Sequence, residues 1–258
     1  MRADVYLVQG GHAPSRTLAQ KLIDSRAVCI DGRVIEKASE DIPEGEHAVS
    51  VQATADTRYV GRGGLKLEAA LAHFPLSVQD RIVADVGAST GGFTDCLLQN
   101  GAARVYAVDA GHGQLHPRLL ADPRVRSAEG VNARYLDPRT LCEIEQAHST
   151  PDPAFDGMVD GCVMDVSFIS QTLILPALAT VIRGGGFLVT LIKPQFELSG
   201  KALGKHGIVK READRRAAVD RVLASAAACG LRPCGLIESP IEGGDGNREY
   251  LAYFIKQE

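Results

Sequence analysis

The stretch that most constrains the fold is residues 82–92, IVADVGASTGG. Its first apolar residues run into Asp85, and a loop with three glycines follows. Residues 93–98, FTDCLL, then have the composition of a helix start. A buried strand, a tight loop and a helix are the opening unit of a doubly wound α/β sheet. We therefore predict an α/β domain with a ligand at this loop, because glycines let backbone N–H groups approach a ligand closely.

The composition is that of a globular protein large enough to bury a full core. The 258 residues are 45% hydrophobic and 23% charged, with a net charge of −4, which excludes a basic coat but allows a local basic face. No apolar run reaches the ~20 residues that span a bilayer, and the start MRADVYLVQGG does not have the pattern of a signal peptide. The six scattered cysteines form no CxxC pair, which indicates free thiols and a cytoplasmic location.

The chain is predicted to divide into a small α+β domain, a linker and a larger α/β domain, at residues 1–57, 58–64 and 65–258. In the small domain, Ser15 can cap a helix over residues 16–24, whose apolar side chains recur at helical spacing. Asp31-Gly32 between alternating apolar residues predicts a hairpin. The basic residues of this domain gather in its first half and the acidic residues in its second.

Two cofactors compete for the glycine loop. Its spacing differs from the dinucleotide motif GxGxxG, and Asp85 favours a cationic ligand over a pyrophosphate. Asp109, at the end of the next predicted strand, suits the ribose hydroxyls of either cofactor. We predict S-adenosylmethionine ahead of a dinucleotide, with a turn that binds nothing as the third possibility. The predicted cofactor contacts are Asp85, Gly87, Ala88, Ser89, Gly91, Gly92, Phe93, Asp109 and Asn132.

The rest of the large domain alternates between predicted strands and helices. Besides the strands that end near Asp85 and Asp109, five strands are predicted, at residues 125–128, 159–165, 187–192, 231–237 and 250–255. A helix over residues 171–182 should be kinked by Pro176 in its interior. Residues 184–186, three glycines, predict a break before the next strand.

Four charged residues flank predicted elements whose ends can meet at one edge of the sheet: Lys66, Asp165, Lys193 and Glu249. Ligands bind at the carboxyl edge of a doubly wound sheet. Lys193 can orient a hydroxyl or take its proton, and Lys66 can hold the attacking oxygen or a phosphate. A sulfonium donor already carries a good leaving group, so alignment of the acceptor oxygen should contribute more than proton removal.

Three motifs in the small domain carry a first resemblance: R-x-D-x-x-L at residues 2–7, SR-x-x-A-x-x-LI at residues 15–23 and V-x-IDG-x-x-I-x-K at residues 28–37. They resemble the alpha-L RNA-binding fold, which implies phosphate contacts by Arg2, Arg16, Lys21, Arg26 and Arg33. To these we add residues of two basic, glycine-rich segments, Arg58, Arg62, Lys201 and Lys205. For the last two, a solvated loop without a ligand is an equal alternative.

Five motifs carry a second resemblance over nearly the whole chain: RGGLKL at 62–67, DVGASTGGFT at 85–94, DVSFIS at 165–170, KPQFE at 193–197 and GNREYL at 246–251. They resemble the TlyA family, whose members are often named haemolysins and join an alpha-L module to an FtsJ-type methyltransferase. The resemblance implies a Rossmann-like class I methyltransferase domain with a mostly parallel seven-stranded sheet. It also implies S-adenosylmethionine-dependent 2′-O-methylation of cytidine in ribosomal RNA by a monomer that binds ribosomal subunits, without a metal or a membrane. The implied catalytic tetrad is Lys66, Asp165, Lys193 and Glu249.

Three other functions are weighed against this one. A membrane-lysing protein would agree with the haemolysin names, but the sequence has no strongly amphipathic basic helix. A non-catalytic RNA-binding protein with an inactive nucleotide-fold domain is less consistent with a complete tetrad. A nicotinamide-dependent enzyme should have a different glycine spacing.

Overall fold

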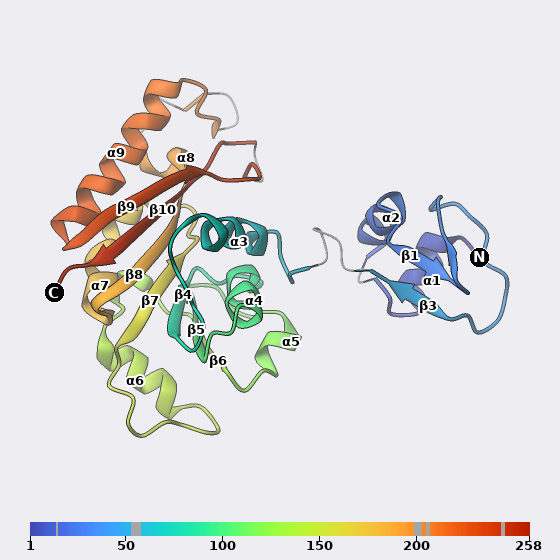
Figure 1. The fold of residues 1–258 in the computed structure, drawn as a ribbon, viewed down its shortest axis with the longest axis horizontal. Coiled ribbons are helices and arrows are strands. Elements are labelled where there is room, and N and C mark those ends of the chain that lie inside the picture. Colours follow the sequence, from blue (N-terminus) through green and yellow to red (C-terminus); the bar gives the residue numbers. More distant parts are fainter. Residues whose placement is uncertain (14, 53–57, 199–202, 205–206, 244–245) are drawn as a thin grey trace. The chain divides into compact units, whose positions relative to one another are not determined.

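The computed structural model describes the chain except for residues 14, 53–57, 199–202, 205–206 and 244–245. The described chain forms two compact units, Met1–Arg58 and Tyr59–Glu258 (Figure 1). Two of the predicted RNA contacts, Lys201 and Lys205, lie outside the described residues.

The smaller unit packs two helices against a three-stranded sheet of order β2-β1-β3 (Figure 1). Its elements are α1 (Ala3–Gln9), α2 (Arg16–Asp24), β1 (Val28–Ile30), β2 (Arg33–Val34) and β3 (Val49–Val51). The predicted α2 is confirmed, and the Ser15 side chain accepts a hydrogen bond from the Leu18 N–H at its start. The predicted hairpin is also confirmed, because Asp31 and Gly32 both have positive φ, as a two-residue turn between β1 and β2 requires.

The larger unit is built on a seven-stranded sheet of order β6-β5-β4-β7-β8-β10-β9. Its strands are β4 (Ile82–Val86), β5 (Arg104–Asp109), β6 (Val125–Glu129), β7 (Val159–Met164), β8 (Ile182–Ile192), β9 (Leu231–Glu238) and β10 (Tyr250–Lys256). The pairings from β6 to β8 are parallel, and β10 runs antiparallel to both β8 and β9. This is the mostly parallel seven-stranded sheet that the sequence predicts.

Helices cover both faces of this sheet (Figure 1). They are α3 (Gly63–His73), α4 (Gly92–Gln99), α5 (Pro117–Leu120), α6 (Pro138–Gln146), α7 (Leu175–Val181), α8 (Pro194–Glu197) and α9 (Glu212–Ala228), with short 3₁₀ turns at Ala133–Tyr135 and Gln171–Leu173. Side chains of α3, α4 and α5 share one core cluster with alternate residues of the strands. Side chains of α6, α7 and α9 share the other. The unit is therefore a three-layer sandwich with a core on each side of the sheet.

Two local predictions are wrong. The helix predicted over residues 171–182 is two pieces, a 3₁₀ turn and α7, and Pro176 lies in the first turn of α7. Proline is tolerated there because the first helical N–H groups have no partner within the helix. Pro176 therefore does not kink α7. The break predicted at residues 184–186 is also absent. Strand β8 runs through these glycines, and an irregularity in its pairing with β7 accommodates them.

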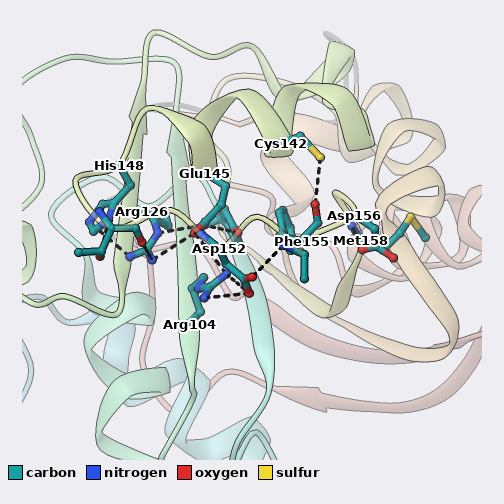
Figure 2. Close-up of polar contacts among 12 residues, drawn as sticks. Arg104, Arg126, Cys142, Glu145, His148, Asp152, Phe155, Asp156 and Met158 are labelled. Carbon is teal, nitrogen blue, oxygen red and sulfur yellow. Dashed lines mark hydrogen bonds and ion pairs between the residues drawn. The ribbon is translucent and has the colours of Figure 1, made fainter.

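A buried charge network fixes the amino ends of β5 and β6 (Figure 2). Glu145 of α6 accepts hydrogen bonds from Arg126 Nε at 2.9 Å and from the Tyr106 hydroxyl at 2.6 Å. Arg104 Nη1 lies 3.4 Å from the same carboxylate. Glu145 and Arg126 are both buried. Since this network lies at the amino end of β5, opposite the edge where ligands bind, it is a structural element.

We predict that Glu145→Gln destabilises the protein by about 3–5 kcal/mol, because Arg126 would keep a buried charge without its carboxylate. Urea unfolding measures this loss. The matched control is Glu143→Gln on the same helix, whose exposed pair with Arg139 should contribute less than about 1 kcal/mol. Equal losses in the two variants would contradict this account of the network.

Candidate active site

The carboxyl ends of three parallel strands and the amino end of an antiparallel one gather the candidate residues at one edge of the sheet. Asp109 ends β5, while Asp165 and Lys193 directly follow β7 and β8. Strand β10 enters at the same edge, because it is antiparallel and its first residue, Tyr250, pairs with Ile192. Glu249, just before β10, therefore lies beside the end of β8.

The tetrad (Lys66, Asp165, Lys193 and Glu249) forms two ion pairs at this edge. Lys66 Nζ, in the first turns of α3, lies 2.5 Å from Glu249 Oε2. Lys193 Nζ lies 2.5 Å from Asp165 Oδ1 and donates a hydrogen bond to Ser167 Oγ at 2.8 Å. Both lysines and Glu249 are buried. Each lysine has a carboxylate of its own, so the four charges balance in pairs.

Two adjoining pockets open beside the tetrad: Asp165 lines both, Lys193 lines the smaller, and Lys66 and Glu249 line neither. The larger has a volume of about 520 Å³ and reaches from the glycine loop over the ends of β5 and β7. The smaller, of about 190 Å³, lies between the glycine loop, the start of α3 and Lys193. Four lining residues are common to both pockets: Gly87, Ser89, Asp165 and Ser167. A group bound in the larger pocket is therefore next to the space in front of Lys193.

Gly87 joins the glycine loop to the tetrad. Its φ is +83°, and a Cβ at this position would lie 2.6 Å from the carbonyl oxygen of Asp165. The Gly87 N–H donates to the carbonyl of Val108 at 2.8 Å, and the Asp165 N–H donates to the carbonyl of Val86 at 3.0 Å. The close approach of these backbones requires glycine here, for both conformational and steric reasons.

Asp85 is a fully buried acid beneath the glycine loop. Its Oδ2 accepts a hydrogen bond from Thr94 Oγ1 at 2.6 Å, while its Oδ1 has no partner among the described residues. Burial raises the pKa of Asp85 to about 7, against the opposing effect of the Thr94 hydrogen bond, and the charge of Asp165 raises it further. A buried acceptor without a partner fits a site that receives a positive charge.

The predicted cofactor residues divide between the pockets. Asp109 and Asn132 line only the larger, Ala88, Gly92 and Phe93 only the smaller, and Gly87 and Ser89 line both. Asp85 and Gly91 belong to neither lining. Asp109 accepts hydrogen bonds from the Ser89 and Gly111 N–H groups at 2.8 and 2.7 Å. The Asn132 side-chain oxygen accepts from the Arg134 N–H and caps a 3₁₀ turn, so its NH₂ group is the part that can contact a ligand.

Sequence reasoning missed several residues of the larger pocket. Its apolar walls include Val108, Val131, Ile169 and Ile174. Phe168 also lines it, is 91% exposed and has a φ of +65°, which is uncommon for a bulky side chain. Its ring lies 5.1 Å from that of Phe196. The available sequence signal was a large aromatic residue in the loop after a strand end. An exposed aromatic ring of this kind can stack on a flat ligand.

The predicted RNA contacts of the smaller unit lie at its surface. Arg2 and Arg16 are brought together at the buried Asp4. Arg26 pairs with Glu36 at 3.2 Å, and Arg33 pairs with Glu40. Three further candidates are also exposed, Lys21, Arg58 and Arg62. Of these, Arg62 lines the smaller pocket.

Comparison with known proteins agrees with this geometry. The sequence model of the FtsJ-like methyltransferase family matches residues 59–256, which contain the glycine loop, both pockets and the tetrad. This chain belongs to that family. The model of the S4 domain matches residues 1–47, within the smaller unit.

Relatives of this FtsJ-like methyltransferase match it over almost its full length. The 16S/23S rRNA (cytidine-2′-O)-methyltransferase TlyA of Mycobacterium tuberculosis is 38% identical over 256 residues, 99% of this chain and 90% of the relative. Hemolysin A of Brachyspira hyodysenteriae is also 38% identical, over 99% of this chain and all of the relative. A solved structure from Streptococcus thermophilus shares 42% identity and a TM-score of 0.72, covering all of this chain and 89% of that one.

We predict that Asp85→Asn stabilises the protein without ligand at pH 8 more than at pH 5. Between about pH 4 and pH 7 the folded Asp85 holds a proton that the unfolded chain has released, so its contribution to stability falls as the pH rises. In this window the free energy of unfolding should fall by up to about 1.4 kcal/mol per pH unit because of Asp85, and the variant should lack this fall. Urea unfolding across pH tests this, with the exposed Asp220→Asn as control. A wild-type curve parallel to that of Asp85→Asn would contradict the raised pKa.

Proposed function

We propose that this chain transfers a methyl group from S-adenosylmethionine to the ribose 2′-hydroxyl of cytidine in ribosomal RNA. The observation that carries this proposal is the ion pair Lys193–Asp165, whose two residues line the pocket beside the glycine loop, with the buried pair Lys66–Glu249 at the same edge of the sheet. The names of the relatives support the acceptor, since TlyA of Mycobacterium tuberculosis is named for cytidine 2′-O-methylation of 16S and 23S rRNA.

The residues of the larger pocket fit S-adenosylmethionine, which supplies an electrophilic methyl group when bound. The pocket volume is within the roughly 300–1,000 Å³ of typical small-molecule sites. The Asp109 carboxylate at the end of β5 suits ribose hydroxyls, and the apolar side chains of Val108 and Ile174 suit an adenine ring. The unpartnered oxygen of Asp85 favours a ligand with positive charge over the negatively charged pyrophosphate of a dinucleotide.

Lys193 can hold the acceptor oxygen in place. An ammonium group has three N–H donors; Lys193 donates one of them to Ser167 and forms an ion pair with Asp165, so donors remain for a ligand. Lys66 and Glu249 line neither pocket, and their buried ion pair lies at the same edge of the sheet. Both lysines are fixed by carboxylates, so the site presents aligned donors. Alignment of the reacting groups can lower the activation barrier by on the order of 7–11 kcal/mol.

Recognition of RNA would involve both units. The smaller unit matches the S4 domain and exposes arginines that can bind phosphates. In the larger unit, Arg62 lines the smaller pocket and can bind a phosphate next to the reacting ribose. Phe168 lines the larger pocket but is 91% exposed, so much of its ring remains open for the acceptor base to stack on. Action on ribosomal RNA implies a cytoplasmic protein, and we expect it to act as a monomer.

Membrane lysis is the second candidate, because the Brachyspira hyodysenteriae relative is named Hemolysin A. None of the helices in the described ranges is long and apolar enough to cross a membrane. Methyl transfer uses all four tetrad residues, whereas lysis would leave them without a role. Lysis of erythrocytes by purified Lys193→Ala protein would favour the second candidate.

The direct test is incubation of the purified protein with methyl-labelled S-adenosylmethionine and ribosomal subunits from cells that lack it. We expect label in ribosomal RNA. Binding of the donor without label in either subunit would overturn the proposal and favour a non-catalytic RNA-binding protein.

We predict that Lys193→Ala lowers the methylation rate at least about 100-fold and leaves the donor Kd within about twofold, because Lys193 orients the acceptor rather than the donor. Single-turnover methylation and calorimetry measure the two quantities. The control Arg139→Ala removes an exposed cation from α6 and should change neither. An equal loss of donor binding in Lys193→Ala would show that its assigned role is wrong.

A second variant tests the stacking ring. Phe168→Ala should raise the KM for RNA about tenfold, since base–aromatic stacking contributes roughly 1–3 kcal/mol per base. Phe168→Tyr should retain the wild-type KM, because it keeps the ring. If Phe168→Ala weakens donor binding instead, the ring belongs to the cofactor site.

A further inference from the structure

The smaller unit contains a buried carboxylate that collects four hydrogen bonds. Asp4, in the first turn of α1, is 0% exposed. Arg2 donates to it from Nε at 3.0 Å and from Nη2 at 3.1 Å. Arg16 Nη2 and Gln20 Nε2 of α2 donate at 2.9 and 2.8 Å. Asp4 thus links the start of one helix to the start of the next.

The two arginines that share Asp4 keep their outer atoms in solvent. Their side chains are 49% and 57% exposed. Two guanidinium groups this close repel each other, and Arg16, at the first position of α2, also opposes the helix dipole. The buried carboxylate offsets both effects, and it fixes side chains that otherwise have many rotamers.

The ionised form of Asp4 is strongly favoured. Hydrogen bonds from Arg2, then Gln20, then Arg16 hold the pKa of this carboxyl far below its usual range, in spite of its burial. Both arginines therefore face a full negative charge at any physiological pH. Arg2 uses two of its five N–H donors on Asp4 and Arg16 uses one, so several donors on each remain for a ligand.

We propose that Asp4 is a positioning residue that holds Arg2 and Arg16 as one rigid clamp for a phosphate of the RNA backbone. Two planar guanidinium groups held side by side match the geometry of a phosphate. Prior ordering by Asp4 removes the entropy cost of fixing two flexible side chains on binding. This inference rests on the proposed function only in taking ribosomal RNA as the ligand.

The sign of the effect separates positioning from simple electrostatics. If Asp4 acted on RNA only through its charge, Asp4→Asn would tighten binding, because it removes a negative charge near a polyanion. If Asp4 positions the clamp, the same variant weakens binding, because the arginines lose their common anchor. The two accounts therefore predict opposite changes in Kd.

The experiment measures the Kd of the full-length protein for ribosomal subunits from cells that lack it, at several KCl concentrations. For Asp4→Asn we expect a Kd about tenfold higher and a salt slope smaller by about one to two. The donor Kd and the kcat at saturating RNA should equal those of wild type. The control Asp24→Asn removes the same charge from an exposed position at the end of α2 and should not weaken binding.

A double-mutant cycle shows whether Asp4 acts through the arginines. In an Arg2→Ala/Arg16→Ala background, Asp4→Asn should have no further effect on Kd. If thermal unfolding shows that Asp4→Asn does not fold, Gln20→Leu replaces it, since it removes one donor to Asp4 and keeps all the charges. We expect this variant to raise the Kd about threefold.

Three results would overturn the inference. They are tighter or unchanged RNA binding in Asp4→Asn, an undiminished effect of Asp4→Asn without the arginines, and, where Gln20→Leu is the test, an unchanged Kd. Failure of the proposed function is distinct from these. It would appear as wild-type protein that binds RNA in an Asp4-dependent way but transfers no methyl group.

Discussion

The close contact between Gly87 and the backbone of Asp165 is the constraint on which the candidate site depends. Strands β4 and β7 are neighbours at the centre of the sheet, and their ends meet where the glycine loop begins. A Cβ at Gly87 would lie 2.6 Å from the Asp165 carbonyl oxygen, so the loop fits only without a side chain at this point. Because Asp165 also pairs with Lys193, this one contact joins the glycine loop to that ion pair.

Charge balance explains why the site can be so polar inside a packed domain. Each tetrad lysine is neutralised by its own carboxylate, and such buried pairs contribute little net stability while fixing geometry. Asp85 is the exception, because burial raises its pKa to about 7 and one of its oxygens has no described partner. Asp85 is therefore an unfavourable buried group beneath the glycine loop, and strongly perturbed acids of this kind cluster at functional sites.

Much of this architecture could be predicted because its signals are local. Adjacent residues in and just after segment 82–92 encode the strand, the glycine loop and the start of the helix. The charged residues at strand ends can be predicted as site residues because ligands bind at the carboxyl edge of such a sheet. The features that were missed depend on distant partners. Pro176 falls at a helix start rather than inside one, β8 passes through three glycines next to β7, and α1 was not predicted at all.

The same limit applies to the site. Residue types and order predict that the tetrad gathers at one edge, but they do not say which lysine pairs with which carboxylate. That choice is tertiary: β10 enters beside the end of β8, yet Glu249 pairs with Lys66 of α3 and Lys193 pairs with Asp165. The positive φ and the exposure of Phe168 are likewise invisible in the sequence. Backbone strain of this kind is found chiefly at functional sites.

We propose that the two pockets and the ion pairs beside them align a ribose hydroxyl with a methyl donor. Mass spectrometry of nucleosides from ribosomal RNA, modified by the purified protein, tests it most directly. We expect 2′-O-methylcytidine as the new product, formed by wild type and lost with Lys193→Ala. A methyl group on a base, or 2′-O-methylcytidine formed equally well without Lys193, would contradict it.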